Sequence, residues 1–302
     1  MAINLPHLNT KTTFPIKPRT NLGPSSARYM PRAIAVAQNH SYWASIEADV
    51  HDHLNKAIQI RPPETVFEPM HYLTFAAPTT AASALCVAAC ELVGGDRAEA
   101  LAAASAIHLM HAAAYAHEHL PLTDKSRPES KPEIHHKFDP NIELLTGDGI
   151  APFGFELLAR SMDPARTDHP DRILRVIAEI SRACGSQGMI NGLHKEEEIL
   201  DQYSRFEFVE YVCKKKYGEV HASGAACGAI LGGGDDEEIE RLRRFGLYAG
   251  TVRGLMEKEN IPEIQNIIRK LKDLALEELE GFHGKNTDLI SSLVFEPSLC
   301  VA

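Results

Sequence analysis

Acidic residues are absent from the first 46 positions of this 302-residue chain, although the whole chain carries a formal charge of −10. The same segment is rich in hydroxyl side chains, has no sustained apolar run, and holds Lys11, Lys17, Arg19, Arg28 and Arg32. This composition is typical of an organelle transit peptide rather than of a secretory signal, which needs an apolar centre. We therefore expect residues 1–42 to be a plastid transit peptide or a disordered segment, and the protein to reside in the chloroplast stroma. An unstructured cytosolic tail is the alternative.

Long apolar runs and metal-finger spacings are also lacking. No stretch approaches the roughly 20 apolar residues that a membrane helix requires, and the six cysteines match neither a zinc finger nor a disulfide scaffold. The acidic body would repel the phosphate groups of nucleic acids and of anionic membranes. We expect a soluble protein with reduced thiols, which binds no nucleic acid and does not insert into a membrane.

Alternating strand patterns are missing as well, whereas helical periodicity is frequent. Apolar residues recur at helical spacing over residues 173–184 and 264–279. Residues 84–93 and 96–119 are alanine-rich on nearly all sides, which is typical of helices packed inside a bundle. The pattern predicts an all-α protein. Asp235 and its neighbour Asp236 are expected to cap the start of a helix.

A histidine-rich run, HAAAYAHEHLPLTD, extends from His111 to Asp124. On a helix, His111, Tyr115 and Glu118 would share one face, and imidazole with carboxylate at this spacing is able to bind a transition metal. The run contains no HExxH motif, and one helix rarely completes a metal site alone. A histidine-rich metal-binding helical protein is therefore one hypothesis.

Five blocks along the chain resemble those of the plant trans-prenyltransferases, the short-chain isoprenyl diphosphate synthases. They are ALCVAACELVGGD from Ala84, HEHLPLTD from His117, LLTGDGIAPFGFELL from Leu144, GSQGMINGLHKEE from Gly185 and CGAILGGGDDEEIERLRRFG from Cys227. The resemblance implies an isoprenoid-synthase-type helical bundle, which we expect over residues 43–302. In that family two Asp-rich motifs on facing helices hold Mg²⁺ ions that clamp an allylic diphosphate.

Both Asp-rich motifs are degenerate in this chain, as far as the resemblance assigns them. The first has Glu118 and His119 in place of its leading aspartates and retains Asp124 at its end. The second is replaced by Glu257, Lys258 and Glu259. Magnesium prefers oxygen ligands, and a lysine beside it would repel it. We therefore expect no metal and no cofactor in this chain.

The cations that hold diphosphate in the family are missing too. The stretch that binds isopentenyl diphosphate falls on residues 77–83, which contain no lysine or arginine, and the arginine pair after the first motif is replaced by SRPESKP. By resemblance, the remaining positions of the substrate pocket are His111, Lys216 and Gln187. They imply a pocket without its metal clamp.

A pair of C-x-x-x-C-like motifs narrows the resemblance to one group of the family. Cys86 and Cys90 share one helical face, and a second motif reads Ser223 to Cys227 with one cysteine replaced. Together with HEHLPLTD, these motifs resemble the non-catalytic small subunits of plant heteromeric geranyl diphosphate synthases. The resemblance implies that these four residues contact a partner, whereas plain core packing is the alternative, because cysteine behaves as a small hydrophobe.

The sequence thus predicts a regulatory, catalytically inactive subunit that directs its complex towards the ten-carbon geranyl diphosphate. The resemblance implies a catalytic large subunit, similar to geranylgeranyl diphosphate synthase, that holds all the Mg²⁺. A self-sufficient divergent prenyltransferase stays open as an alternative, with replacement ligands at Glu118, Asp124, Glu257 and Glu259.

Overall fold

Helices make up the fold throughout the residues that the structure describes. The computed structural model describes residues 32–120, 136–161, 169–198, 206–258 and 262–295. In these ranges the helices are α1 (Arg32–Ala57), α2 (Glu64–Ala76), α3 (Ala81–Val93), α4 (Arg97–His119), α5 (Pro140–Arg160), α6 (Pro170–Cys184), α7 (Met189–Glu198), α8 (Phe206–Cys213), the π-helix η1 (Lys214–Gly218), α9 (Glu219–Leu231), α10 (Asp236–Met256), α11 (Pro262–Leu279) and α12 (Asp288–Phe295). The prediction of an all-α bundle is confirmed.

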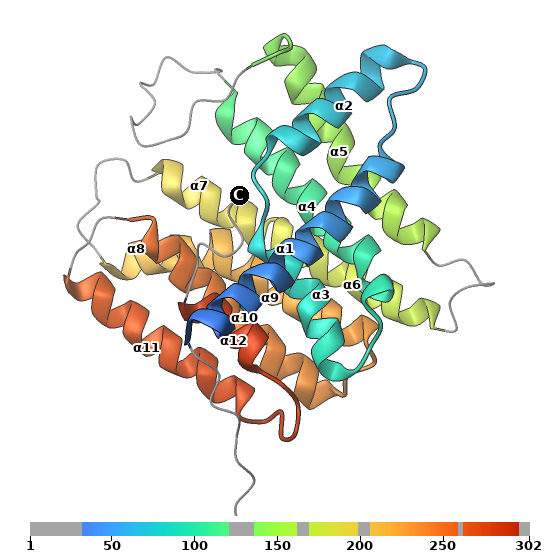
Figure 1. Ribbon diagram of the computed structural model, residues 1–302. Helices are drawn as coiled ribbons and strands as arrows, with labels where there is room; N and C mark the ends of the chain where they lie inside the picture. Colours follow the sequence, from blue (N-terminus) through green and yellow to red (C-terminus); the bar gives the residue numbers. More distant parts are fainter. Residues whose placement is uncertain (1–31, 121–135, 162–168, 199–205, 259–261, 296–302) are drawn as a thin grey trace, which may run out of the picture.

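The helix α9 is the centre of the bundle, with α3, α6 and α10 packed around it (Figure 1). Every side chain of α9 from Val220 to Leu231 is buried. Glycines allow the close approach of these helices, because a Cβ added at Gly228 would stand 1.9 Å from the carbonyl oxygen of Cys86 on α3. A Cβ at Gly246 of α10 would stand 2.4 Å from the carbonyl oxygen of His221.

The predicted cap at Asp235 is confirmed and has a reciprocal partner. The Glu238 backbone N–H donates to Asp235 Oδ1 at 2.8 Å, and the Asp235 N–H donates to Glu238 Oε2 at 3.1 Å. This capping box satisfies two N–H groups that the first turn of α10 leaves without helical partners. Asp236 follows as the first residue of the helix.

The first helix begins before the predicted domain boundary at residue 43. It starts at Arg32, while residues 1–31 lie outside the described residues. Trp43 is the first fully buried side chain that the structure describes, and its indole Nε1–H donates to Ser292 Oγ of α12 at 3.0 Å. The transit peptide and its end point stay predictions.

None of the described helices is by itself long and apolar enough to cross a membrane. The α2 and α3 helices meet that criterion only as a pair, and the chain bends by 78° between them.

Candidate functional site

The degenerate first motif ends α4 and is bound by a lysine from the π-helix η1. Lys216 Nζ donates to Glu118 Oε1 at 2.7 Å, and the lysine side chain is only 11% exposed. His119 turns away from this pair, since its Nδ1–H donates to the carbonyl oxygen of Tyr115 at 2.7 Å and its ring packs on the Tyr115 ring. Asp124 lies outside the described residues. Two predicted site residues, Glu118 and Lys216, are therefore brought together.

The same lysine continues into a chain of alternating charges. Lys216 Nζ lies 3.0 Å from Glu196 Oε2 on α7, and Glu196 Oε1 accepts from Lys258 Nζ at 3.1 Å. Lys258 lies two residues beyond the end of α10 and belongs, by resemblance, to the degenerate second motif. Four charged side chains, Glu118, Lys216, Glu196 and Lys258, thus join the two motifs. We call these four residues the ion-pair chain.

The charges of the ion-pair chain shift the pKa values of its own members and of Tyr217. Burial alone would raise the pKa of Glu196, but the ammonium groups of Lys216 and Lys258 hold it below its usual range. Burial opposes the charged form of Lys216, whereas Glu118 and Glu196 raise its pKa. The pKa of the Tyr217 phenol is raised by burial and by the carboxylates of Glu257, Glu118 and Glu196. Tyr217 therefore stays protonated beside these carboxylates.

The described residues do not fit the magnesium ions that the fold family implies. Mg²⁺ requires near-octahedral oxygen ligation and tolerates no ammonium group among its ligands. Glu118 and Glu196 already bind lysine, and no group of three His, Cys, Asp or Glu side chains in the described ranges is able to hold a metal ion. Glu259 lies outside those ranges. No catalytic step is derived through a metal in this chain.

The other residual pocket positions do not join the ion-pair chain. His111 on α4 has a buried Nε2 with no hydrogen-bond partner among the described residues, and burial, with neighbouring His108, lowers its pKa to about 3. The Nε2 of His221 on α9 is likewise buried with no hydrogen-bond partner among the described residues, and burial together with Arg253 lowers the pKa of this histidine to about 4. Gln187 is exposed, and its backbone carbonyl oxygen accepts a hydrogen bond from Lys215 Nζ at 2.8 Å.

The segment that lost the family's cations now lines a pocket that contains a carboxylate. The pocket has a volume of about 60 Å³ and is lined by Ile46, Glu47, Val50, His51, Leu54, Phe75, Ala77, Thr79, Thr80, Ser83, Ala84 and His108. The Thr79 hydroxyl donates to Glu47 Oε1 at 3.4 Å, and burial raises the pKa of Glu47. A carboxylate in this position would repel a diphosphate.

Sequence reasoning missed Glu47 and Glu196. No motif marks Glu47, which is one polar residue of the long helix α1. Glu196 lies in the GSQGMINGLHKEE block and begins the run Glu196–Glu198, and such a run of glutamates is typical of a solvated helix end. Only the fold shows that Glu196 faces Lys216. The lysine itself was the available signal, because a buried ammonium group requires acidic partners.

The four residues of the C-x-x-x-C-like motifs are buried on α3 and α9, and Cys227 Sγ donates to the Val176 carbonyl oxygen of α6 at 3.9 Å. Cys86, Cys90 and Cys227 are 0% exposed, and Ser223 is 1% exposed. Their side chains therefore offer no surface to a partner, and the core-packing alternative describes their positions. A role at the interface would have to act through the packing of α3 on α9, and it stays a prediction.

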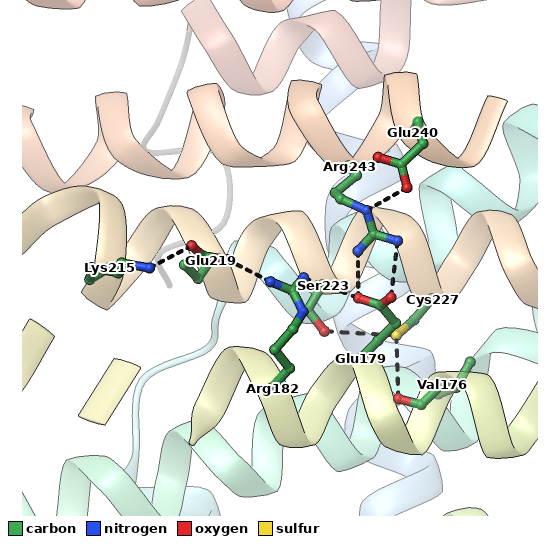
Figure 2. A network of polar contacts seen from close by, with 9 residues as sticks. All are labelled: Val176, Glu179, Arg182, Lys215, Glu219, Ser223, Cys227, Glu240 and Arg243. Atoms are coloured by element: carbon green, nitrogen blue, oxygen red, sulfur yellow. Dashed lines mark hydrogen bonds and ion pairs between the residues drawn. The ribbon is translucent and has the colours of Figure 1, made fainter. Parts of the chain in front are cut away.

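A polar network runs along one side of Cys227 and ties α6 to α9 and α10 (Figure 2). Arg243 on α10 binds Glu179 on α6 through both terminal guanidinium nitrogens, with Nη2 at 3.0 Å from Oε1. Arg182 extends the network to Glu219, which also pairs with Lys215. Burial alone would raise the pKa of Glu179, but these two arginines lower it.

Comparisons with known proteins point to one group of plant proteins. No protein-family profile matches the chain. A chloroplastic small subunit 2 of heterodimeric geranylgeranyl pyrophosphate synthase from Cannabis sativa is 47% identical over 287 residues, which cover 90% of this chain and 99% of the relative.

Two solved structures are more similar in sequence. A chain from a deletion mutant of the heterotetrameric geranyl pyrophosphate synthase of mint, in complex with ligands, is 69% identical with a TM-score of 0.76, covering 84% of this chain and 99% of that one. The geranyl diphosphate synthase small subunit of Antirrhinum majus is 61% identical with a TM-score of 0.78, covering 85% and 98% respectively.

Proposed function

Because the chain belongs to the small subunits of plant heteromeric prenyl diphosphate synthases, within the trans-prenyltransferase family, we propose that it is the regulatory subunit of a heteromeric geranyl diphosphate synthase. Its partner is a catalytic large subunit similar to geranylgeranyl diphosphate synthase. The complex makes the ten-carbon geranyl diphosphate for terpenoid biosynthesis. The higher identity to the two geranyl diphosphate synthase structures supports the ten-carbon product over the twenty-carbon one.

The chain is catalytically inactive alone, and its partner supplies the Mg²⁺. The observation that carries this part is the 2.7 Å contact between Lys216 Nζ and Glu118 Oε1, which places an ammonium group at the first motif. Departure of a diphosphate requires strong charge stabilisation, which the family obtains from metal ions and cations. At Thr79 and its neighbours those cations are replaced by neutral side chains, and Glu47 adds a negative charge.

The self-sufficient prenyltransferase is less well supported by this geometry. Its replacement ligands would include Glu118, which binds Lys216, and Glu257, which lies beside the protonated Tyr217. A histidine-rich metal site is likewise less well supported, because no group of three His, Cys, Asp or Glu side chains among the described residues is able to hold a metal ion.

Regulation requires no chemistry from this chain. A subunit that binds one conformation of its partner more tightly will shift the partner towards that conformation, and the elongation cavity then has the shape that favours the ten-carbon product. Faster release of the ten-carbon product would also shorten the product. The relatives are chloroplastic proteins, which supports a plastid location, and we extend this to the stroma.

Activity of the isolated chain tests the inactive part of the proposal. Incubated with Mg²⁺, dimethylallyl diphosphate and isopentenyl diphosphate, the chain is expected to form no prenyl diphosphate above background. The double variant Glu118→Asp with His119→Asp is expected to remain inactive, because it leaves Lys258 and Thr79 unchanged and a diphosphate clamp acts as a unit. Mg²⁺-dependent synthesis by either protein alone would refute this part.

A further inference from the structure

The ion-pair chain joins the same two motifs that metal ions connect in the fold family. Glu118 stands at the end of α4, and Lys258 stands two residues beyond the end of α10. Between them lie Lys216 on η1 and Glu196 on α7, with successive N···O distances of 2.7, 3.0 and 3.1 Å. These contacts connect three helical elements and the segment that follows α10.

The central charges of the ion-pair chain are screened little by water. Lys216 is 11% exposed, while Glu118 and Glu196 are 20% and 24% exposed. Two carboxylates that share one ammonium group would repel each other without it, and the repulsion is stronger where water is scarce. The carboxylate of Glu257 is a third negative group at this place, because Tyr217 interacts with Glu257 as well as with Glu118 and Glu196. A cation is therefore required here.

The π-helix η1 determines which lysine supplies this cation. Lys215 and Lys216 are adjacent, but Lys215 pairs with Glu219, the first residue of the following helix α9, at 3.1 Å and donates to the backbone carbonyl oxygen of Gln187. Lys216 pairs instead with two residues from distant helices. Single π turns are frequently found at functional sites, where they redirect side chains. The two neighbouring lysines thus differ in role and form a matched pair for experiment.

We propose that the ammonium groups of Lys216 and Lys258 act as built-in counter-cations, which hold the α4, α7, η1 and α10 ends together without a divalent metal ion. This inference concerns the stability of the folded chain rather than its lack of catalysis. It rests on the proposed function only because the family resemblance assigns Glu118 and Lys258 to the two motifs. Its test measures melting and metal binding rather than synthesis. A failure here would therefore be distinct from a failure of the proposed function.

The test compares melting temperatures of the full chain in EDTA and in Mg²⁺ or Mn²⁺. The wild type is expected to melt at the same temperature in all three. The double variant Lys216→Met with Lys258→Met is expected to melt several degrees lower in EDTA and to recover part of this loss in Mn²⁺, since its freed carboxylates are oxygen ligands. Mn²⁺ binding, measured by electron paramagnetic resonance, should be at least tenfold tighter than in the wild type.

Lys215→Met is the matched control, because it removes one positive charge from the same turn without touching the ion-pair chain. It is expected to show no metal response. The proposal is overturned if the wild type is stabilised by divalent ions more than this control, or if the double variant gains no Mn²⁺ affinity.

If the double variant does not fold, Lys258→Met alone decides the question. Lys258 is 33% exposed and leaves Glu196 paired with Lys216. A folded Lys258→Met protein should melt at a lower temperature than Lys215→Met, and it should show no Mn²⁺ response because Lys216 still binds Glu118 and Glu196. Equal melting temperatures of the two variants would contradict the proposal.

Discussion

Gly228 of α9 packs so closely on Cys86 of α3 that any side chain at residue 228 would enter the space of the Cys86 carbonyl oxygen. The two helices therefore approach each other at small residues on both sides. Cys86, for which the resemblance implied a partner interface, belongs to this internal contact, while Cys227 is buried beside Val176 of α6. The packing requires the small size of these residues rather than their thiol chemistry.

Replacing Gly228 by alanine is expected to destabilise the fold by about 1 to 3 kcal/mol or more, because the clash is with backbone and neither helix is able to yield. Urea unfolding of the isolated chain measures this. Gly149→Ala on α5 is the control, since a Cβ there meets nothing within 4 Å. That variant should be neutral or stabilised by up to about 1 kcal/mol. Similar effects at both positions would contradict the packing argument.

Bulky replacement of Cys86 is expected to prevent folding rather than only to weaken partner binding. Cys86→Trp inserts a large ring where the side chain is 0% exposed, whereas Cys86→Ala loses little volume. Circular dichroism and melting of the isolated variants distinguish these outcomes. A Cys86→Trp protein with native helix content and normal melting would show that the α3–α9 contact is looser than described.

The buried thiols are expected to be unreactive in the native protein. Burial raises the pKa of Cys90, Cys213 and Cys227 to about 12 each, so almost no thiolate exists at neutral pH. A thiol reagent should label these three only after denaturation. Rapid native labelling of any of them, located by peptide mass spectrometry, would contradict the burial.

The ion pair between Glu179 and Arg243 is expected to contribute measurably to stability. Glu179→Gln removes the charge that binds Arg243 and Arg182. Glu179 and Arg243 are only 16% and 17% exposed, and hydrogen bonds to charged groups are worth about 1.5 to 3 kcal/mol. The control is Glu156→Gln on α5, whose pair with Arg160 is largely exposed and should contribute at most about 1 kcal/mol. Equal losses in urea unfolding would refute this ranking.

Stability is expected to fall as the pH drops below about 6.5, the usual pKa of histidine. Burial lowers the pKa of His111 to about 3 and of His221 to about 4, so the unfolded chain binds more protons than the native one in this window. The free energy of unfolding is therefore largest above the unfolded pKa and declines towards acid pH. The double variant His111→Gln with His221→Gln should show a weaker decline between pH 7 and pH 5. An identical decline would assign the effect to other groups.

The fold was largely predictable from the sequence, whereas the site was predictable only in part. Alanine-rich and periodic segments marked α3, α4, α6 and α11 because interior helices need small or apolar residues on most faces. The loss of the aspartates and cations is what the family resemblance implies from the sequence, and it stays a prediction. The pairing of Lys216 with Glu196 was not predictable, since Glu196 lies 20 residues away in an acidic run and the two meet only where α7 packs on η1.

The cysteine motifs show what residue spacing alone does not determine. Spacing placed Cys86 and Cys90 on one helical face, but spacing does not determine whether that face meets solvent, a partner or another helix of the same chain. The answer came from the glycines of α9, whose missing side chains make room for α3. A motif of small residues is compatible with either kind of helix contact.

The chain-length distribution of the partner's product tests the central claim most directly. A catalytic geranylgeranyl diphosphate synthase from the same plant is assayed with Mg²⁺, dimethylallyl diphosphate and isopentenyl diphosphate, alone and after co-purification with this chain. We predict a stable complex whose main product is the ten-carbon geranyl diphosphate, whereas the partner alone makes the twenty-carbon product. A complex that forms but leaves the product length unchanged would contradict the account.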